Sequence, residues 1–298
     1  MTTPLPFQRD ETGPWAGVGV LRLEQPGKPV VVLDADLVDR LESALNALPM
    51  GLRGLVLASA SERVFVAGAD LKAIQDLSDA DLHRYLARAG RVYGMIAQLP
   101  YPTVAAINGA ALGGGLELAM HCDGLVACPG TKPYPVGLPE AGLSICPGWG
   151  GTNLLAARLQ DAAKALTMTA AGQTMTFDEA HASGLFDSVA PDASTLINAA
   201  KSWLVSQPAR TREDRDGAPF RWIGRPGTRA RVLAALDQVR DAIVQTGPGK
   251  AVALAVDAGL TKGWAAALEV EQRELVKLRS SPEGKAAIAS FFERAAKK

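Results

Sequence analysis

The sequence has few cysteines, no net charge and no long hydrophobic run. Three cysteines, Cys122, Cys128 and Cys146, are too few and too irregularly spaced for a disulfide framework, and no Cys-x-x-Cys or Cys/His ligand spacing occurs. Lys plus Arg and Asp plus Glu each number 31, so no overall field favours nucleic acid or an anionic membrane surface. We therefore expect a protein of the reducing cytoplasm that holds no metal and binds no nucleic acid.

Targeting and membrane segments are missing as well. Residues 1–11 contain neither the basic start nor the apolar core of a signal peptide, and no uninterrupted apolar stretch reaches about 18 residues. Secretion and membrane insertion are therefore not expected. The chain nevertheless has 298 residues, of which 48% are apolar, and this is enough to bury a full hydrophobic core.

Strand and helix patterns alternate along the first two-thirds of the chain. Short apolar runs predict strands at 17–24, 54–58, 64–66, 103–107 and 124–128, and helical periodicity predicts helices at 35–48, 79–99, 116–120 and 152–159. Asp34 and Thr152 are suited to cap two of these helices, and 176–190 predicts a short capped helix followed by a short strand. From residue 195 onward only helical patterns follow, apart from a polar connection at 207–227. The pattern predicts an α/β core at 1–194 and a helical region at 195–298.

Two glycine clusters stand where helices are expected to begin. The first reads Gly-Gly-Gly-Leu-Glu at 113–117, and the second runs from Gly137 to Gly151. Glycines at a helix entry let backbone N–H groups face a ligand, and the helix dipole favours negative charge there, so an oxyanion site is one interpretation. Tight helix–strand packing is the other. A nucleotide loop does not fit, because Gly-Leu-Glu replaces the Gly-Lys-Ser/Thr of a Walker A loop and Leu118 replaces the last Rossmann glycine.

Each glycine cluster carries a carboxylate, Glu117 in the first and Glu140 in the second. Taken singly, each has an ordinary explanation, since an acidic residue suits the first turn of a helix and a surface carboxylate can cap one. Taken together they suggest acid/base chemistry, because two carboxylates that share a site push their pKa values apart and leave one as acid and one as base.

Several other residues allow two readings. The basic run 221–231 is either a solvated connection or a contact for an anionic ligand or a neighbouring subunit. His121 and Cys122 are expected to be packed at the end of their helix, while His83 and His181 fall in helical surface patterns. Trp149 either lines a pocket or caps the core, and we favour the pocket.

Four blocks in fixed order carry a family resemblance: 64–72 (Val-Phe-Val-Ala-Gly-Ala-Asp-Leu-Lys), 102–109, 113–117 and 138–152. They resemble the signature blocks of the crotonase (enoyl-CoA hydratase/isomerase) superfamily, clearly over about 15–192 and more weakly from Trp264. The resemblance implies an α/β fold, a crotonase-like spiral core of ββα units with a helical C-terminal region that serves trimerisation and covers the active site.

The resemblance also implies a site and a reaction. The backbone N–H groups of Ala69 and Gly114 would hold the thioester oxygen as an oxyanion hole. Glu140 would be the principal acid/base, Glu117 would position the water, and the Gly148 N–H would help to orient it. Residues that would contact coenzyme A are Val66, Ala67, Gly68, Asp70, Leu71 and Lys72, although Asp70 and Lys72 are equally well read as surface charges. Trp149 would line the acyl pocket.

The implied reaction is the syn addition of water to a trans-2-enoyl-CoA thioester, which gives a 3-hydroxyacyl-CoA in fatty-acid β-oxidation or related metabolism. No cofactor is expected, because coenzyme A is part of the substrate, and a homotrimer or a dimer of trimers is expected. An enoyl-CoA isomerase of the same fold is the near alternative, and a non-catalytic acyl-CoA-binding protein is the distant one.

Some positions depart from the family pattern. The block at 25–33 has Val where the family usually has Asn, which resembles the hydratase portion of multifunctional fatty-acid oxidation subunits, as does the block Val-Gly-Leu-Pro-Glu at 136–140. With 298 residues and no Rossmann motif, the chain is expected to be free-standing. The stretch 207–227 has no family counterpart.

Overall fold

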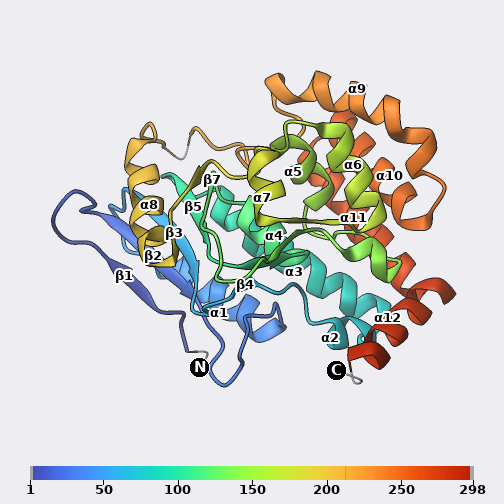
Figure 1. Ribbon diagram of the computed structural model, residues 1–298, viewed down its shortest axis with the longest axis horizontal. Coiled ribbons are helices and arrows are strands. Elements are labelled where there is room, and N and C mark those ends of the chain that lie inside the picture. Colours follow the sequence, from blue (N-terminus) through green and yellow to red (C-terminus); the bar gives the residue numbers. More distant parts are fainter. Residues whose placement is uncertain (1–2, 212, 296–298) are drawn as a thin grey trace. The chain divides into compact units, whose positions relative to one another are not determined.

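The computed structural model describes residues 3–211 and 213–295, whose elements are labelled in Figure 1. The chain forms two compact units. Unit 1 contains the described residues of Met1–Gly68, Arg91–Val136 and Met175–Phe220, and unit 2 contains those of Ala69–Gly90, Gly137–Thr174 and Arg221–Lys298. Each unit is therefore assembled from three separate segments of the sequence. The division at residue 194 predicted above stays a prediction.

A six-stranded sheet forms the centre of unit 1. Its order is β1-β2-β3-β5-β7-β10, in which β1 is antiparallel to β2 and the other neighbours are parallel. The bounds are Phe7–Arg9, Val18–Leu23, Gly54–Ser59, Thr103–Ile107, Gly124–Ala127 and Ser188–Val189. All residues of β3, β5 and β7 are buried, as expected for parallel strands that are covered on both faces.

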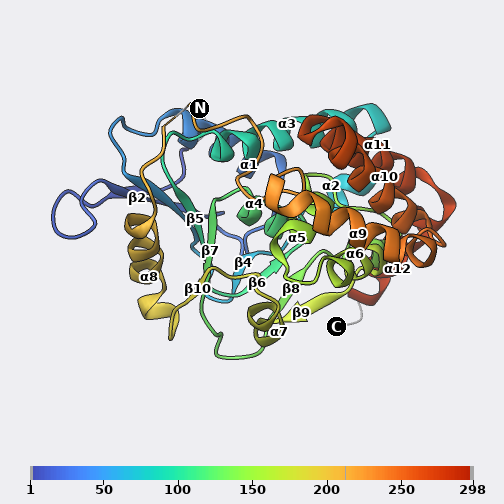
Figure 2. The same ribbon diagram turned by 90° about the horizontal axis from the view of Figure 1, so that it is seen from above.

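Helix α8 (Ala193–Ser206) packs against β3, β5 and β7, as Figures 1 and 2 show. Its buried residues Leu196, Ala200 and Leu204 recur every four positions and join the valines of those strands in one hydrophobic cluster. Unit 1 also contains the helices α1 (Ala35–Asn46), α4 (Gly114–Met120) and α7 (Phe177–Ala182).

A second sheet has the order β4-β6-β8-β9 and uses strands of three residues each. They are Val64–Val66, Ala110–Leu112, Pro135–Gly137 and Thr174–Thr176. Strand β4 pairs in parallel with β6, with Val64 opposite Ala110. This pairing brings the block at 64–72 beside the segment that leads into the glycine triplet.

Unit 2 is helical. It contains α2 (Leu71–Asp76), α5 (Gly151–Arg158), α6 (Ala162–Ala171), α9 (Pro226–Ile243), α10 (Gly247–Lys262), α11 (Trp264–Ser280), α12 (Pro282–Ala295) and the 3₁₀ turn η1 (Glu140–Leu143). Helix α3 (Asp79–Ala97) runs through the boundary between Gly90 and Arg91. Within unit 2, α10 packs on α11, α6 packs on α9, and α12 contacts η1.

Most predicted caps are confirmed, and one is wrong. Asp34 accepts a hydrogen bond from Leu37 N at 2.8 Å, and Thr176 with Glu179 forms a capping box at α7. Thr152, however, lies inside α5, and Gly150 occupies the cap position with φ of 98°. A side chain from a distant helix accepts hydrogen bonds from the N–H groups at this end, as described below. The local sequence therefore wrongly predicted Thr152 as the cap.

The basic run contributes to unit 2 through Arg231. Its guanidinium donates to the carbonyl oxygens of Leu159 at 2.7 Å and Ala157 at 3.0 Å, at the C-terminal end of α5. This end of a helix carries partial negative charge, so a cation stabilises it. Arg231 therefore binds the protein's own backbone, which neither reading of the run foresaw.

The polar connection 207–227 is anchored to unit 1 by Arg215. Its guanidinium forms a two-point pair with the buried carboxylate of Asp123, with N–O distances of 2.6 and 2.9 Å, and also donates to Leu99 O and Tyr101 O. Asp123 in turn accepts from Thr103 N at 2.9 Å. The pair thus ties the connection to the start of β5.

We expect Arg215→Ala to lower the free energy of unfolding by about 3 kcal/mol, because the buried carboxylate of Asp123 loses its two-point partner and keeps only Arg210, at 3.9 Å. Both side chains are almost fully buried, at 4% and 1% exposure, so solvent offers little compensation. Urea unfolding of the variant measures the loss, and Arg229→Ala, at an exposed position of α9, is the control. Equal stability of the two variants would contradict the anchoring role.

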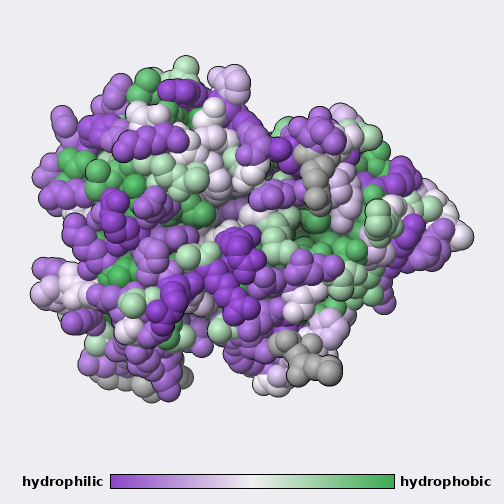
Figure 3. All heavy atoms as spheres, turned by 180° about the vertical axis from the view of Figure 1, so that it is seen from behind, coloured by the Kyte–Doolittle hydropathy of each residue, from purple (hydrophilic) through white to green (hydrophobic). Residues whose placement is uncertain are grey.

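The surface drawn in Figure 3 mixes hydrophilic and hydrophobic residues. Within residues 3–211 and 213–295, no helix combines the length and the apolar character needed to cross a bilayer. The three cysteines are buried and form no disulfide.

Candidate active site

One group of candidate residues lies in unit 1, at the entry to α4. Gly113 has φ of 53°, a conformation that favours glycine, and Gly114 is the first helical residue. The N–H groups of a first helical turn have no partner within the helix, so the Gly114 N–H is available to a ligand. The predicted geometry of the triplet as a helix entry is confirmed.

Close packing of α4 on β4 requires the third glycine. A Cβ added at Gly115 would lie 2.4 Å from Val66 O, so no larger residue fits without displacement of the backbone. Gly68 has φ of 111°, and a Cβ added there would lie 3.1 Å from Leu112 O, so this position is also closely packed. Residues 66–68 and 112–115 are thus side by side, and Ala69 follows directly in the chain.

Glu117 lies in the first turn of α4 and is 1% exposed. Its N–H donates to Gly113 O at 3.0 Å, and the Tyr93 hydroxyl donates to Gly114 O at 3.3 Å. The imidazole of His121 contacts Glu117 O at 2.9 Å and stands edge-on to Tyr93. His121 is therefore packed at the helix end, as predicted, and Glu117 is a buried carboxylate on a rigid helix.

Another group of candidate residues lies in unit 2, where Glu140 begins η1. Although Glu140 is partly exposed as a whole residue, its Oε2 is buried and accepts no hydrogen bond within the described part of the chain. Burial raises the pKa of the Glu140 carboxyl to about 8, and the carboxylate of Glu271 adds to the increase. Burial therefore favours the protonated form of this carboxyl group.

The turn that contains Gly148 follows Glu140 and is tightly enclosed. A Cβ at Gly148 would lie 2.8 Å from Leu275 Cδ1, and one at Gly150 would lie 2.2 Å from the Trp264 ring. The Trp149 indole is 2% exposed, donates to Leu86 O at 2.9 Å and meets Tyr85 edge-on. Its predicted place in the acyl pocket stays a prediction.

The residues predicted to contact coenzyme A fall in both units. In unit 1, Val66 ends β4 and Ala67 N donates to Val31 O at 2.9 Å, which fixes this segment to the loop before α1. In unit 2, Asp70 caps α2 by accepting from Lys72 N at 3.0 Å and from Ala73 N, while Leu71 begins the helix and Lys72 is exposed. Asp70 thus has a local structural task.

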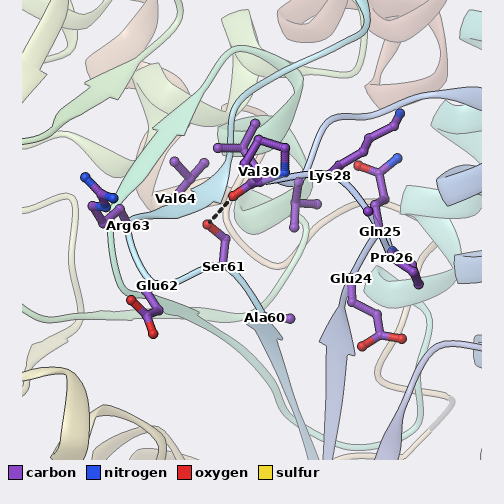
Figure 4. A pocket seen from close by; sticks show the side chains of 13 residues that line it. Glu24, Gln25, Pro26, Lys28, Val30, Ala60, Ser61, Glu62, Arg63 and Val64 are labelled. Carbon is purple, nitrogen blue, oxygen red and sulfur yellow. Dashed lines mark hydrogen bonds between the residues drawn. The ribbon is translucent and has the colours of Figure 1, made fainter.

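A cavity of about 660 Å³ lies in unit 1 and reaches Val64, the first residue of β4 (Figure 4). Two loops line it, residues 24–31 and 60–64, and Ser61 Oγ donates to Pro29 O between them at 3.5 Å. Lys28 and Arg63 stand on opposite sides of the cavity in Figure 4. Lys28 pairs with Asp34 at 2.6 Å, and Arg63 is exposed. Neither cation was expected from the sequence to contact a ligand.

Glu271 is a third residue that the sequence patterns did not single out. It is fully buried on α11, and it lies four residues from Ala267 and from Leu275, which are buried too. A glutamate on the apolar stripe of a helix was the available signal, since that face points to the core. In the described part of the chain, no group of three or more His, Cys, Asp or Glu side chains is arranged to hold a metal ion.

Residues 14–212 match the family model described as enoyl-CoA hydratase/isomerase, and the chain belongs to this family. The predicted superfamily and its α/β fold are confirmed.

Curated relatives include the fatty acid oxidation complex subunit alpha of Shewanella loihica, 34% identical over 281 residues, and that of Shewanella halifaxensis, 32% identical over 284 residues. Each match covers 93% of this chain, but the chain spans only 40% and 39% of these relatives' length.

Solved structures share the fold. An enoyl-CoA hydratase from Bacillus halodurans aligns with a TM-score of 0.67 at 20% identity, covering 97% of this chain and 100% of that one. Human mitochondrial delta3-delta2-enoyl-CoA isomerase aligns with a TM-score of 0.68 at 22% identity, covering 99% of both chains. At these identities the likeness concerns the fold alone, and the choice between hydration and isomerisation rests on side chains.

Proposed function

We propose that this chain is an enoyl-CoA hydratase that adds water to a trans-2-enoyl-CoA thioester. The family match and the names of the relatives support the hydratase class. The observation that carries the proposal is the buried Oε2 of Glu140, which accepts no hydrogen bond within the described residues and whose surroundings favour the protonated form. An acid with a pKa near the working pH is suited to give a proton in the reaction and to recover it afterwards.

In the proposed reaction, Glu117 takes a proton from water, and the oxygen of that water forms a bond to C3. The C2–C3 double bond opens, and negative charge moves onto the thioester oxygen, where the N–H groups of Ala69 and Gly114 stabilise it. Glu140 then gives its proton to C2. One proton returns from Glu117 to Glu140 by way of water before the next turnover, and Gly148 N–H orients the attacking water.

Activity should accordingly depend on a protonated Glu140. Since the pKa of this carboxyl group is raised to about 8, the rate falls as pH rises through that value, and the protonated form predominates below it. The burial of Glu117 suits the role of base, because a buried carboxylate on a rigid helix keeps its place near the bound water.

The cavity between loops 24–31 and 60–64 is the place we propose for the nucleotide end of coenzyme A. Residues 60–64, which line it, lead along the chain into the segment 66–68, and it carries Lys28 and Arg63, which suit the phosphate groups of that nucleotide. The thioester end would then extend along 66–68 towards the oxyanion donors. Asp70, Leu71 and Lys72 stay proposed contacts of the same ligand.

We expect Arg63→Ala to raise the KM for acyl-CoA about tenfold and to leave kcat unchanged, because one charge-assisted hydrogen bond is worth about 1.5–3 kcal/mol. Initial rates with crotonyl-CoA measure the effect. The matched control is crotonyl-pantetheine, which lacks the nucleotide and should react equally well with both proteins. An equal loss on the two substrates would contradict a role in nucleotide binding.

A panel of 2-enoyl- and 3-enoyl-CoA thioesters of several chain lengths tests the proposed function. We expect steady loss of the enoyl-thioester absorbance with 2-enoyl substrates and a 3-hydroxyacyl-CoA product. No turnover of these, together with conversion of a 3-enoyl-CoA, would identify an isomerase instead. Binding without any turnover would identify a non-catalytic acyl-CoA-binding protein.

The assembly is proposed to be a homotrimer or a dimer of trimers, located in the cytoplasm. Exposed large hydrophobic residues support association through the helices of unit 2, namely Leu233 on α9, Leu254 on α10 and Phe291 on α12. The mass of the protein in solution, measured by light scattering, tests this proposal.

A further inference from the structure

Glu271 joins the C-terminal helix α11 to the turn that follows Glu140. Its carboxylate accepts hydrogen bonds from Gly150 N, from Thr152 Oγ1 and, at 3.0 Å, from Thr152 N. These are donors of the first turn of α5, which would otherwise have no partner. A charged side chain from a helix far along the sequence therefore caps α5.

Helix α11 holds the same turn at further points. Cys146 Sγ donates to the backbone carbonyl of Glu271 at 3.7 Å, and Gln272 Nε2 donates to Leu86 O, which also accepts from Trp149. Leu275 of α11 packs directly on Gly148. Both ends of the turn 146–152, as well as its middle, are thus fixed by one helix.

The turn is connected to Glu140 by a short, constrained segment. Ile145 N donates to Glu140 O at 3.2 Å, and Ser144 between them has φ of 57°, the left-handed conformation that side chains rarely adopt. A displacement of the turn would therefore also displace Glu140, since no flexible linker lies between them.

Charge also connects the two glutamates. The elements packed against η1 include α6 and α12, and their charged residues, Lys164, Glu283, Lys285, Glu293 and Arg294, are all exposed. Glu271 is the charged group of unit 2 that acts on the Glu140 carboxyl, and it raises the pKa of that group. Burial raises the pKa of Glu271 too, while the hydrogen bonds from Thr152 and Gly150 oppose this and favour its ionised form.

We propose that Glu271 is a positioning residue for the reaction: it holds the turn that carries Gly148 in place and sets the charge around Glu140. The inference rests on the proposed hydratase function. It assigns to the C-terminal helix a task inside the site of its own chain, in addition to any part in assembly.

Two substitutions at Glu271 distinguish the effect of its side-chain position from the effect of its charge. Glu271→Gln keeps the shape and removes the charge, whereas Glu271→Asp keeps the charge and shortens the side chain. We expect both to lower kcat by about 10- to 100-fold with KM within about twofold, because a small misplacement of catalytic groups has effects of this size. Only Glu271→Gln should move the alkaline limb of the pH–rate profile to lower pH, because the negative neighbour of Glu140 is gone. Glu269→Gln, exposed on the same helix, is the control.

A direct titration of the Glu140 carboxyl by carbon-13 NMR, assigned by comparison with Glu140→Gln, makes the result independent of turnover. The pH midpoint of this titration should be lower in Glu271→Gln than in the wild-type protein, and it should be unchanged in Glu269→Gln. The proposal would be overturned if Glu271→Gln reduced kcat but left both the alkaline limb of the pH–rate profile and the titration midpoint of Glu140 unchanged. Glu271 would then act only as a structural cap of α5. Should Glu271→Gln not fold, wild-type kcat in Glu271→Asp would overturn it as well. A wild-type protein without hydration would contradict the proposed function, and the titration would still decide on Glu271.

Discussion

Glu140→Gln should reduce the kcat for hydration of crotonyl-CoA by about 10²–10⁴-fold, the usual contribution of a general acid/base. The amide has nearly the shape of the carboxyl group but cannot give a proton to C2. Because Oε2 of Glu140 accepts no hydrogen bond within the described residues, the substitution breaks no such bond at this atom. KM should stay within about twofold, since the proposed contacts with coenzyme A lie elsewhere.

The companion substitution Glu117→Gln should reduce kcat by a similar factor, because the amide cannot take a proton from the attacking water. Glu269→Gln, at an exposed position, serves as the control for both. Near-full hydration by either glutamine variant would show that the two-carboxylate mechanism is wrong. Comparison of thermal unfolding among the variants separates a loss of chemistry from a loss of structure.

Gly114→Pro should lower kcat by about 10²–10³-fold, the effect of removing one donor from an oxyanion hole. Proline replaces the backbone N–H by a ring carbon, so the donor is lost and the ring occupies the place where the oxyanion would sit. Gly114 is the first residue of α4, and this is the helical position that tolerates proline best, so we expect the helix to persist.

Gly114→Ala is the matched control, because alanine keeps the N–H group. We expect the alanine variant to retain much more activity than the proline variant at equal helix content by circular dichroism. Equal activity of the two variants would remove Gly114 N–H from the mechanism. Gly115 offers no such experiment, because even a Cβ there would meet the Val66 carbonyl.

Local signals in the sequence predicted the elements that local physics determines. The buried strands β2, β3, β5 and β7 follow from their apolar runs, and the Asp34 cap and the Thr176–Glu179 box act over three residues. The three-residue strands β6, β8 and β9 were not predicted, because their sequences Ala-Ala-Leu, Pro-Val-Gly and Thr-Met-Thr lack the bulky apolar run Val-Phe-Val that marked β4.

Long-range contacts account for what the sequence could not predict. Thr152 was read as a cap because its true partner, Glu271, lies 119 residues away in the chain. The role of Arg215 depends on Asp123, 92 residues earlier, and that of Arg231 on carbonyl groups of α5. Glu140 was predicted from its glycine-rich context, but its raised pKa arises from burial and from Glu271, and neither is visible locally.

One labelling experiment tests the central proposal, that paired glutamates add water across the double bond. The protein is incubated with crotonyl-CoA in deuterated water enriched in heavy oxygen, and the product is examined by mass spectrometry and NMR. We expect a 3-hydroxybutyryl-CoA that carries heavy oxygen on C3 and one deuterium on C2. A Glu140→Gln reaction of equal duration should form about 10²–10⁴-fold less of this product. Deuterium in a shifted enoyl-CoA without any heavy oxygen would contradict the proposal.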